Sequence, residues 1–314
     1  MNLISKAAEV LLQEQLQDWD LAKDNYAALA EVKTKDFSFG DFTIRVQFNP
    51  ARIQSSAAKV DTKSIQERKC FLCPQNLPEE QKNIPFNQEY EVLVNPYPIF
   101  PKHFTIPTYT HTDQLVLHRF SDMLDLTQTF DGYVIFYNGP KCGASAPDHA
   151  HFQAGSKGFL PLEKDMKTIR KEILSVEENL NVYTLKDYLR NGFLIESKDK
   201  NKAVGYFEKL YSKIEIKEGE KEPMLNILSW YEEGSWFTCI FPREKHRPSC
   251  YFAEGEDNIL ISPGSVDLGG VFITPVEKDF NKINKDDIIA ILKEICISDK
   301  KFNEIIEKLK SIEL

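Results

Sequence analysis

The sequence lacks long apolar runs and has only six histidines in 314 residues. Its apolar runs are far shorter than the roughly 20 residues that a membrane-spanning helix needs. The first residues, Met1 to Lys6, lack the charged-then-apolar order of a secretory signal. We therefore expect no contact with a membrane and a location in the cytoplasm.

A dense cysteine pattern and a net positive charge are also missing. Six cysteines scattered over the chain do not form a disulfide framework, which agrees with a reducing compartment. A net charge of -9 argues against a nucleic-acid partner, because such a partner requires a basic face that neutralises phosphates. Small phosphorylated ligands remain open, since a few local cations can bind them at any net charge.

The chain exceeds the usual size of one hydrophobic core, so two domains are expected. The composition of the Gly-Ser-Lys-Gly stretch at 155–158 suggests a boundary there, with one domain over residues 1–160 and a second over 161–314. The pattern of apolar residues predicts a mixed α+β protein. Helices are expected over residues 3–16, 113–130, 165–180 and 201–211 and in a pair from 286 onward, and strands over 42–48, 90–94, 104–109, 133–137, 224–230 and 236–242.

Two of the six histidines stand one residue apart in the stretch CGASAPDHAHFQAG, residues 142–155. In an extended strand alternate residues share a face, so His149, His151 and Gln153 would project together. A neutral imidazole is a good nucleophile toward phosphorus once its other ring nitrogen donates to a backbone carbonyl. The Gln153 amide and the turn of Gly143 and Ser145 could donate to phosphate oxygens. A polar strand edge with two hydrogen-bonded histidines is the alternative that the motif alone leaves open.

Three short motifs resemble the active-site segment of the histidine-triad superfamily: Asn138-Gly, Gly143-x-Ser145 and His149-x-His151-x-Gln153. They are most similar to the branch in which glutamine replaces the third histidine. That branch holds galactose-1-phosphate uridylyltransferase, diadenosine tetraphosphate phosphorylase and the GDP-hexose phosphorylases. The resemblance covers roughly residues 40–155. One spacing differs, since three residues separate Ser145 from His149 where relatives usually have two.

The resemblance implies a fold and a set of roles. The fold is an antiparallel sheet with flanking helices, built as two related halves of which the second is diverged and aids substrate binding. His151 would be the nucleophile, Gln153 would hold the phosphate, and Ser145 is a further catalytic candidate. The substrate-binding candidates are Asn138 under the phosphate turn, Gly143 in the turn, and Arg52 and Asn95 as nucleotide contacts.

The knuckle Cys70-Phe-Leu-Cys73 could chelate one tetrahedral zinc from a tight turn. A redox pair and plain packing of the two cysteines are the alternatives. The uridylyltransferases carry a similar knuckle, whose zinc is completed by a histidine after the second strand and by the first histidine of the pair. The resemblance therefore implies His111 and His149 as the remaining ligands of a structural zinc.

A second cationic group follows the strand expected at 236–242. Arg243, Lys245 and His246 could gather around a phosphate or sugar phosphate. A solvated basic turn is the alternative. His103 occupies a place where relatives often have a strand-bracing histidine, and His118 on the expected helix is not a ligand candidate.

The reaction that the resemblance implies is a ping-pong nucleotidyl transfer through His151. The donor would be a nucleotide sugar or a dinucleoside polyphosphate, and the acceptor a phosphorylated sugar or inorganic phosphate. A hydrolase of the same fold and a non-enzymatic, zinc-stabilised nucleotide-binding protein are the alternatives. The sequence does not identify the base, the sugar or the acceptor. It also leaves the oligomeric state open, and a homodimer is one possibility.

Overall fold

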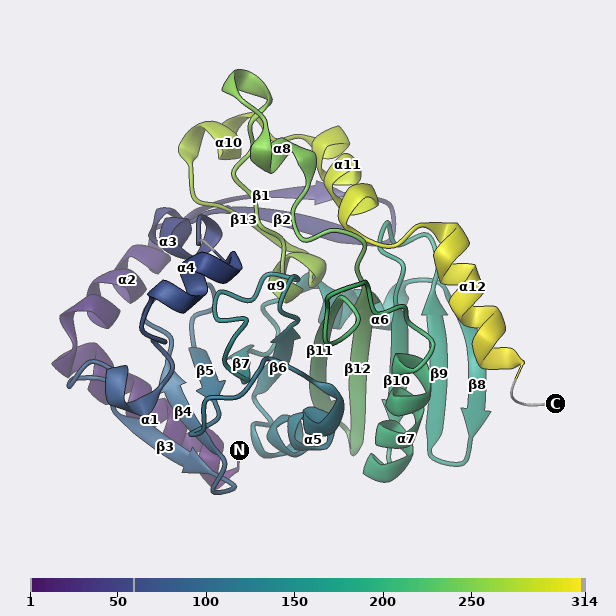
Figure 1. Cartoon of the computed structure of the whole chain (residues 1–314), viewed down its shortest axis with the longest axis horizontal. Coiled ribbons are helices and arrows are strands. Elements are labelled where there is room, and N and C mark those ends of the chain that lie inside the picture. Colours follow the sequence, from purple (N-terminus) through teal and green to yellow (C-terminus); the bar gives the residue numbers. More distant parts are fainter. Residues whose placement is uncertain (1, 59, 312–314) are drawn as a thin grey trace.

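The central layer is one ten-stranded antiparallel sheet with the strand order β3-β4-β5-β7-β6-β11-β12-β10-β9-β8 (Figure 1). The computed structural model describes residues 2–58 and 60–311. The strands of this sheet are β3 (Asn83–Phe86), β4 (Tyr90–Val94), β5 (His103–Pro107), β6 (Tyr133–Asn138), β7 (His151–Ser156), β8 (Lys171–Glu177), β9 (Leu180–Leu185), β10 (Phe193–Ser197), β11 (Leu225–Glu232) and β12 (Ser235–Pro242).

Different elements cover the two faces of the sheet. Helices α1 (Leu3–Asp18), α5 (Phe120–Thr129), α7 (Lys200–Tyr211) and α12 (Asp299–Lys310) contribute to the core on one face. The opposite face carries a three-stranded sheet of β1 (Lys33–Ser38), β2 (Thr43–Phe48) and β13 (Val271–Thr274), with helices α6 (Pro161–Thr168), α9 (Ser265–Leu268), α10 (Glu277–Lys282) and α11 (Lys285–Ile295). The expected α+β class, with an antiparallel sheet and flanking helices, is confirmed.

The large sheet consists of two five-stranded halves with the same topology. Three strands, a helix and two more strands follow one another in each half, with α5 leading to β6 and α7 leading to β11. The halves meet where β6 pairs with β11. β12, the counterpart of β7, contains no histidine. The His-x-His-x-Gln motif is therefore present in one half only, and the division into domains at residue 160 stays a prediction because the sheet is continuous across it.

Alternation along the central strands buries both faces of the sheet. In β6, Tyr133, Ile135 and Tyr137 belong to the core under the helices, whereas Val134 and Phe136 belong to the core under the small sheet. In β7, Phe152 and Ala154 also belong to the core under the helices. The alternate residues of β7 therefore face the side of the small sheet.

Two expected helices differ from the structure. The helix expected at 165–180 ends at Thr168, and the chain then forms the hairpin β8–β9. Asn179 adopts a positive φ of 64° in the turn of that hairpin, which is the local signal for a turn. The helix expected from Asp113 starts only at Phe120, after a short 3-10 turn at Leu117–Arg119.

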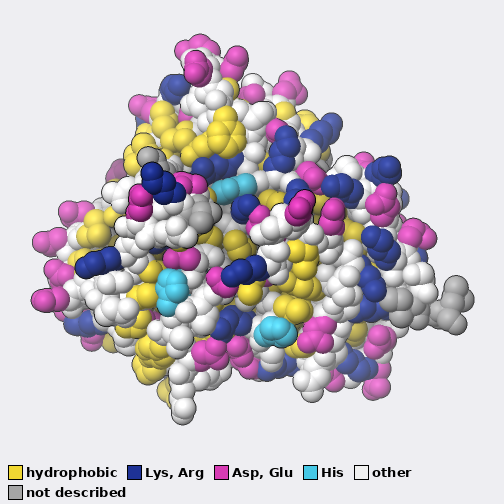
Figure 2. Space-filling view, in the orientation of Figure 1, with side chains coloured by type: hydrophobic (Ala, Val, Ile, Leu, Met, Phe, Trp, Pro, Cys, Tyr) yellow, Lys and Arg dark blue, Asp and Glu magenta, His cyan; other side chains and the backbone are white. Residues whose placement is uncertain are grey.

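The helices not yet named lie outside the two cores or at their edges. All of them except α2 are short. They are α2 (Asp20–Ala30), α3 (Ile53–Ser56), α4 (Thr62–Glu67) and α8 (Ser249–Phe252). Throughout the part of the chain that the structure describes, no helix combines the length and the apolar character needed to cross a membrane. On the face shown in Figure 2, Lys and Arg side chains are interspersed with Asp and Glu.

A buried carboxyl group lies near the seam between the halves. Oε1 of Glu222 lies 2.5 Å from the Tyr137 hydroxyl oxygen, and Oε2 accepts from the Val116 N–H at 2.9 Å. Burial raises the pKa of Glu222 from 4.5 to about 7. Between these two pH values the folded protein keeps a proton that the unfolded chain releases. Glu222 therefore stabilises the fold at low pH, and this contribution is lost as the pH rises through about 7.

Replacing Glu222 with glutamine should flatten the pH dependence of stability between roughly pH 4.5 and pH 7. The parent should lose up to about 3 kcal/mol over this window that the variant keeps, at about 1.36 kcal/mol per pKa unit. Urea unfolding at several pH values measures the difference. Glu218→Gln, at an exposed carboxyl in the same connection, is the matched control. Equal slopes for the parent and Glu222→Gln would contradict the expectation.

Candidate active site

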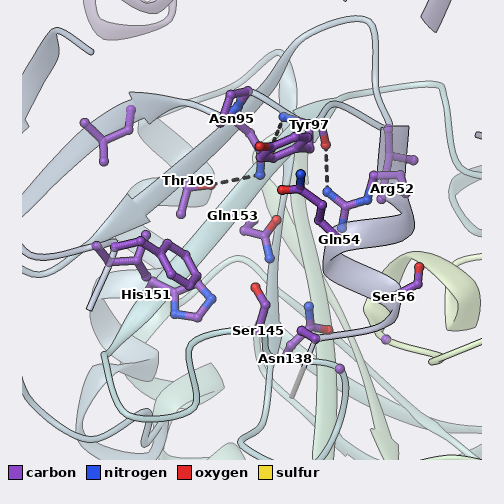
Figure 3. A pocket seen from close by; sticks show the side chains of 18 of the residues that line it. Arg52, Gln54, Ser56, Asn95, Tyr97, Thr105, Asn138, Ser145, His151 and Gln153 are labelled. Carbon is purple, nitrogen blue, oxygen red and sulfur yellow. Dashed lines mark hydrogen bonds between the residues drawn. The ribbon is translucent and has the colours of Figure 1, made fainter. Parts of the chain in front are cut away.

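A cavity of about 690 Å³ opens beside β7 on the side of the small sheet. Seven of the residues singled out in the sequence line it: Arg52, Asn95, Asn138, Gly143, Ser145, His151 and Gln153. Figure 3 shows Gln153 projecting between Asn95 on one side and Ser145 on the other. The structure thus brings together polar side chains that lie up to about a hundred residues apart in the sequence.

His151 is the first residue of β7, and His149 lies on the turn before it rather than in the strand, contrary to the shared strand face expected. The Nδ1–H of His151 donates to the carbonyl oxygen of His149 at 2.8 Å, because a carbonyl can only accept. The unprotonated Nε2 therefore carries the lone pair. Burial lowers the pKa of His151 to about 4, which keeps the ring neutral near pH 7.

The Gln153 amide is oriented by a second histidine. The Nδ1 atom of His103 accepts from the Ile99 N–H at 3.2 Å, so the ring proton sits on Nε2. That Nε2–H donates to Oε1 of Gln153 at 3.0 Å. Burial lowers the pKa of His103 to about 3, so this neutral tautomer persists. Within the described part of the chain the two N–H groups of Gln153 have no hydrogen-bond acceptor, so they are available to the cavity as donors.

Replacing His103 with phenylalanine should slow any reaction that needs the Gln153 amide as a donor. The ring keeps its packing against Phe100, but Oε1 of Gln153 loses its donor and the amide can turn. We expect about a tenfold lower turnover, equivalent to about 1.4 kcal/mol for one hydrogen bond. Steady-state kinetics measures it. His103→Gln keeps an N–H donor and should retain more activity, and equal losses in the two variants would count against this role.

The turn that carries Gly143 and Ser145 packs against the second half of the chain. Gly143 has a φ of +94°, and a Cβ there would lie 2.7 Å from Cα of Gly264, so only glycine fits. Oδ1 of Asn138 accepts from the N–H of Ser265 at 2.7 Å and from Nδ2 of Asn226 at 2.9 Å. The loop before α9 therefore packs against the turn that carries Gly143 and Ser145.

Arg52 and Asn95 lie on the opposite wall of the cavity. One Arg52 nitrogen donates to the Tyr97 carbonyl at 2.6 Å, and among the described residues this guanidinium forms no ion pair. Burial lowers the pKa of Arg52 to about 10, which leaves it cationic. Asn95 donates to the Thr105 hydroxyl at 3.0 Å and accepts from the Tyr97 N–H at 2.9 Å, so it holds the Pro-rich turn in place. Arg52 is thus a positive charge available to an anion.

The four predicted metal ligands form one cluster. The ligand atoms of Cys70, Cys73, His111 and His149 lie within 4.8 Å of one another. Nδ1 of His149 is 3.2 Å from Sγ of Cys70, and Nδ1 of His111 is 3.2 Å from Sγ of Cys73. Nε2–H of His149 donates to the Thr108 carbonyl at 2.8 Å, which directs Nδ1 toward the thiols. Two thiols and two imidazoles are a donor set that suits a tetrahedral metal, so this group could bind one.

The last residue of the loop between Ser145 and His149 lies beside the metal-ligand cluster. Asp148 accepts from Arg68 at 2.7 Å, and its other oxygen lies 3.7 Å from Nε2 of His111. The longer loop therefore supplies a carboxylate beside the metal-ligand cluster while Ser145 still lines the cavity.

The cationic group after β12 does not line the cavity. Arg243 donates five hydrogen bonds, to the carbonyl groups of Ile295, Pro263, Lys245 and His246 and to Oδ1 of Asn226. The expected phosphate contact by Arg243 is therefore wrong, because no donor remains. Lys245 pairs with Glu294 at the surface, and burial lowers the pKa of His246 to about 3, so neither acts as a cation in the cavity. Through Asn226, Arg243 instead braces Asn138.

One cavity residue lacked a signal in the sequence. Asp267 of α9 lines the cavity and accepts from the Gly264 N–H at 2.8 Å and the Ile273 N–H at 3.2 Å. Burial raises its pKa to about 6. It stands in a turn-rich loop of the second half, more than 110 residues after His151, and only folding brings the two to the same cavity.

Two family models divide the chain between them. A model described as a domain of unknown function (DUF4922) matches residues 11–156, and the model of the GDPGP1-like C-terminal domain matches residues 163–313. A search of curated proteins finds no match.

Several solved structures of yeast Ap4A phosphorylase Apa2 share the fold. The complex with AMP matches with a TM-score of 0.58 at 15% identity, over 90% of this chain and 97% of that chain. The complex with Ap4A gives 0.57 at 15% identity, over 88% and 96%. Identities this low show the fold alone. Residues 163–313 thus match the GDPGP1-like C-terminal domain, and the chain as a whole has the fold of Ap4A phosphorylase.

Proposed function

We propose that the protein is a nucleotidyltransferase or phosphorylase that works through a covalent nucleotidyl-His151 intermediate. The observation that carries the proposal is the state of His151, a neutral ring whose Nδ1–H is held by a backbone carbonyl and whose other nitrogen is free at a cavity. The donor is a nucleotide sugar or a dinucleoside polyphosphate, the class that includes the Ap4A bound by the yeast phosphorylase.

In the first step Nε2 of His151 attacks the α-phosphorus of the donor. A P–N bond forms and the P–O bond to the leaving group breaks. The electron pair departs with the sugar phosphate of a nucleotide sugar or with the nucleoside polyphosphate of a dinucleoside polyphosphate. The Nδ1–H stays bonded to the His149 carbonyl and stabilises the positive charge that develops on the ring. The free N–H groups of Gln153 and the guanidinium of Arg52 face the negative charge that builds on the phosphoryl oxygens.

In the second step an acceptor enters the space that the leaving group vacated. Inorganic phosphate or a phosphorylated sugar attacks the phosphorus through an oxygen, and the P–N bond breaks to regenerate the neutral imidazole. Ser145 and the Gly143 turn line the same cavity and can orient the transferred phosphoryl group. Asp267 lies on the wall formed by the second half, where it could accept hydrogen bonds from hydroxyl groups of donor or acceptor.

The Cys70, Cys73, His111 and His149 cluster would hold a zinc ion. Four protein ligands close a tetrahedral site, so the metal would be structural and no position would remain for substrate. Its contribution would be to hold the turn at His149, whose carbonyl oxygen orients the ring of His151. The substrate contacts themselves come from residues of the chain.

The test is capture of the intermediate. Purified protein is mixed with Ap4A, GDP-glucose or UDP-glucose without acceptor, and intact-mass spectrometry reads the mass of one nucleoside monophosphate added per chain. Phosphate or a sugar phosphate should then discharge the adduct. Absence of any adduct with all of these donors, under conditions where the protein binds them, would overturn the proposal.

The two alternatives give different products. A hydrolase of the same fold would release the nucleoside monophosphate at the same rate with or without phosphate. A non-enzymatic binding protein would bind the donors and leave them intact, and changes at His151 and Gln153 would leave that binding in place.

A further inference from the structure

We propose that Gln114 is a positioning residue for His151. Its side-chain amide takes the place of a peptide group between β6 and β7 and holds the main chain of His151 at both its N–H and its C=O. The inference rests on the proposed function, because it takes His151 as the nucleophile.

The starting point is the place where β6 and β7 separate. The last pair of their ladder is Phe136 with Gln153, and two residues further the same register would pair Asn138 with His151. On its other side His151 stands opposite Pro107, which has no N–H to donate. His151 therefore lies at the end of both of its ladders, where a strand would ordinarily fray.

The Gln114 side chain fills the gap at this point. Its Nε2 donates to the carbonyl oxygens of Asn138 and His151, both at 3.0 Å, and its Oε1 accepts from the His151 N–H at 2.7 Å. Gln114 is fully buried, so these three bonds are shielded from water. One amide thus links the end of β6 to both main-chain groups of the proposed nucleophile.

The main chain of Gln114 is held in turn. Its carbonyl oxygen accepts from the Tyr137 hydroxyl at 3.0 Å, and that hydroxyl also lies 2.5 Å from Oε1 of Glu222. Glu222 in addition accepts from the N–H of Val116, two residues after Gln114. The segment that carries Gln114 is irregular rather than helical, and only that shape lets its amide reach between the two strands.

The geometry has a direct bearing on the reaction. With Gln114 in place, β6 and β7 stay apart at Asn138 and His151, and the turn with Gly143 and Ser145 has room between them. Without it, the buried N–H and C=O of His151 would lose their partners and the ring could shift relative to the bound phosphorus. A displacement of about 1 Å can cost about a hundredfold in rate.

The test uses Gln114→Leu, which keeps the bulk of the side chain and removes all three hydrogen bonds. The donor that labels the parent protein is used in single-turnover experiments. We expect the rate of adduct formation to fall about a hundredfold, while the donor concentration for half-maximal rate changes less than about twofold, because Gln114 does not line the cavity. A rate within about twofold of the parent would overturn the proposal.

Thr127→Val is the matched control for a general loss of stability. Thr127 is buried in α5 and donates to the Met123 carbonyl, so its replacement removes a buried hydrogen bond that does not reach His151. If Gln114→Leu fails to fold, Gln114→Glu keeps the shape and the acceptor and removes the donors. A purely structural role predicts equal kinetic losses in the control and in the Gln114 variants at matched stability, and that result would also overturn the proposal.

A spectroscopic readout separates this proposal from the proposed function. With ¹⁵N-labelled histidine, the six histidines give few enough ring signals to follow His151 as an Nδ1–H tautomer. The Gln114 variants should shift or broaden that signal. If the parent forms no adduct with any donor, the proposed function fails, but the histidine signal still tests the positioning role of Gln114. A His151 signal that is unchanged in the Gln114 variants would refute that positioning role.

Discussion

Replacing His151 with glycine is expected to abolish the nucleotidyl adduct while metal content and melting temperature stay near those of the parent. Loss of a covalent nucleophile should lower turnover about 10⁴-fold or more. The fold should tolerate the change because the ring borders the cavity rather than filling the apolar core. Intact-mass spectrometry, metal analysis and a thermal melt measure the three quantities. We expect added imidazole to enter the vacated space, and partial recovery of turnover would identify the missing group as the nucleophile.

A second histidine provides the comparison for this result. His118→Ala removes a histidine from the 3-10 turn before α5, outside the lining of the cavity, and should leave the adduct unchanged. A nucleoside monophosphate found on the His151→Gly protein would show that another residue is the nucleophile. The roles of His149 and His151 would then have to be reassigned.

If the Cys70, Cys73, His111 and His149 cluster holds zinc as proposed, replacing Cys73 with serine should release the metal and lower both stability and activity. A metal ion present at about a thousandfold above its Kd adds about 4 kcal/mol to the free energy of unfolding. We therefore expect a loss of stability of this order when one of the coordinating residues is removed. Activity should fall as a consequence, because the turn at His149 no longer holds the carbonyl that orients His151. Metal analysis, a thermal melt and the rate of adduct formation measure the effects.

Cys250→Ser serves as the matched control, since Cys250 is a free, half-buried cysteine outside the metal-ligand cluster. It should keep the metal and the melting temperature of the parent. The order of events can be checked with a chelator, which should reproduce the Cys73→Ser phenotype in the parent protein. Native protein purified without any bound metal would contradict the metal site altogether.

The local patterns of the first half could be read from its sequence. The strands at β4, β5 and β6 have strong apolar patterns and clear Pro or Gly ends, and the structure confirms them with shifts of one or two residues at most. The motif at His149 to Gln153 stands out in the sequence because histidine is scarce, although β7 begins only at His151 and the expected strand face shared with His149 is wrong. The cluster at Cys70 and Cys73 also followed from local spacing combined with a family resemblance.

The rest depends on contacts between distant segments. Nothing near Asp113 indicates that Gln114 leaves the helical pattern, because its partners Asn138 and His151 come later in the chain. Arg243 was expected to bind phosphate from its charge alone, whereas folding surrounds it with carbonyl groups from three separate segments. A cationic residue in a sequence indicates a ligand only when the fold leaves its donors unused.

The pairing of β6 with β11 has a consequence for synthesis of the chain. The ribosome completes β6 at Asn138 well before it reaches β11 at Leu225. Until then β6, whose residues are all buried in the folded protein, is an unpaired edge strand of the nascent first half. Such an edge is a template for pairing with another chain. Co-translational folding should therefore depend on chaperones until β11 emerges, and a fragment ending near residue 160 should aggregate or pair with its own copies.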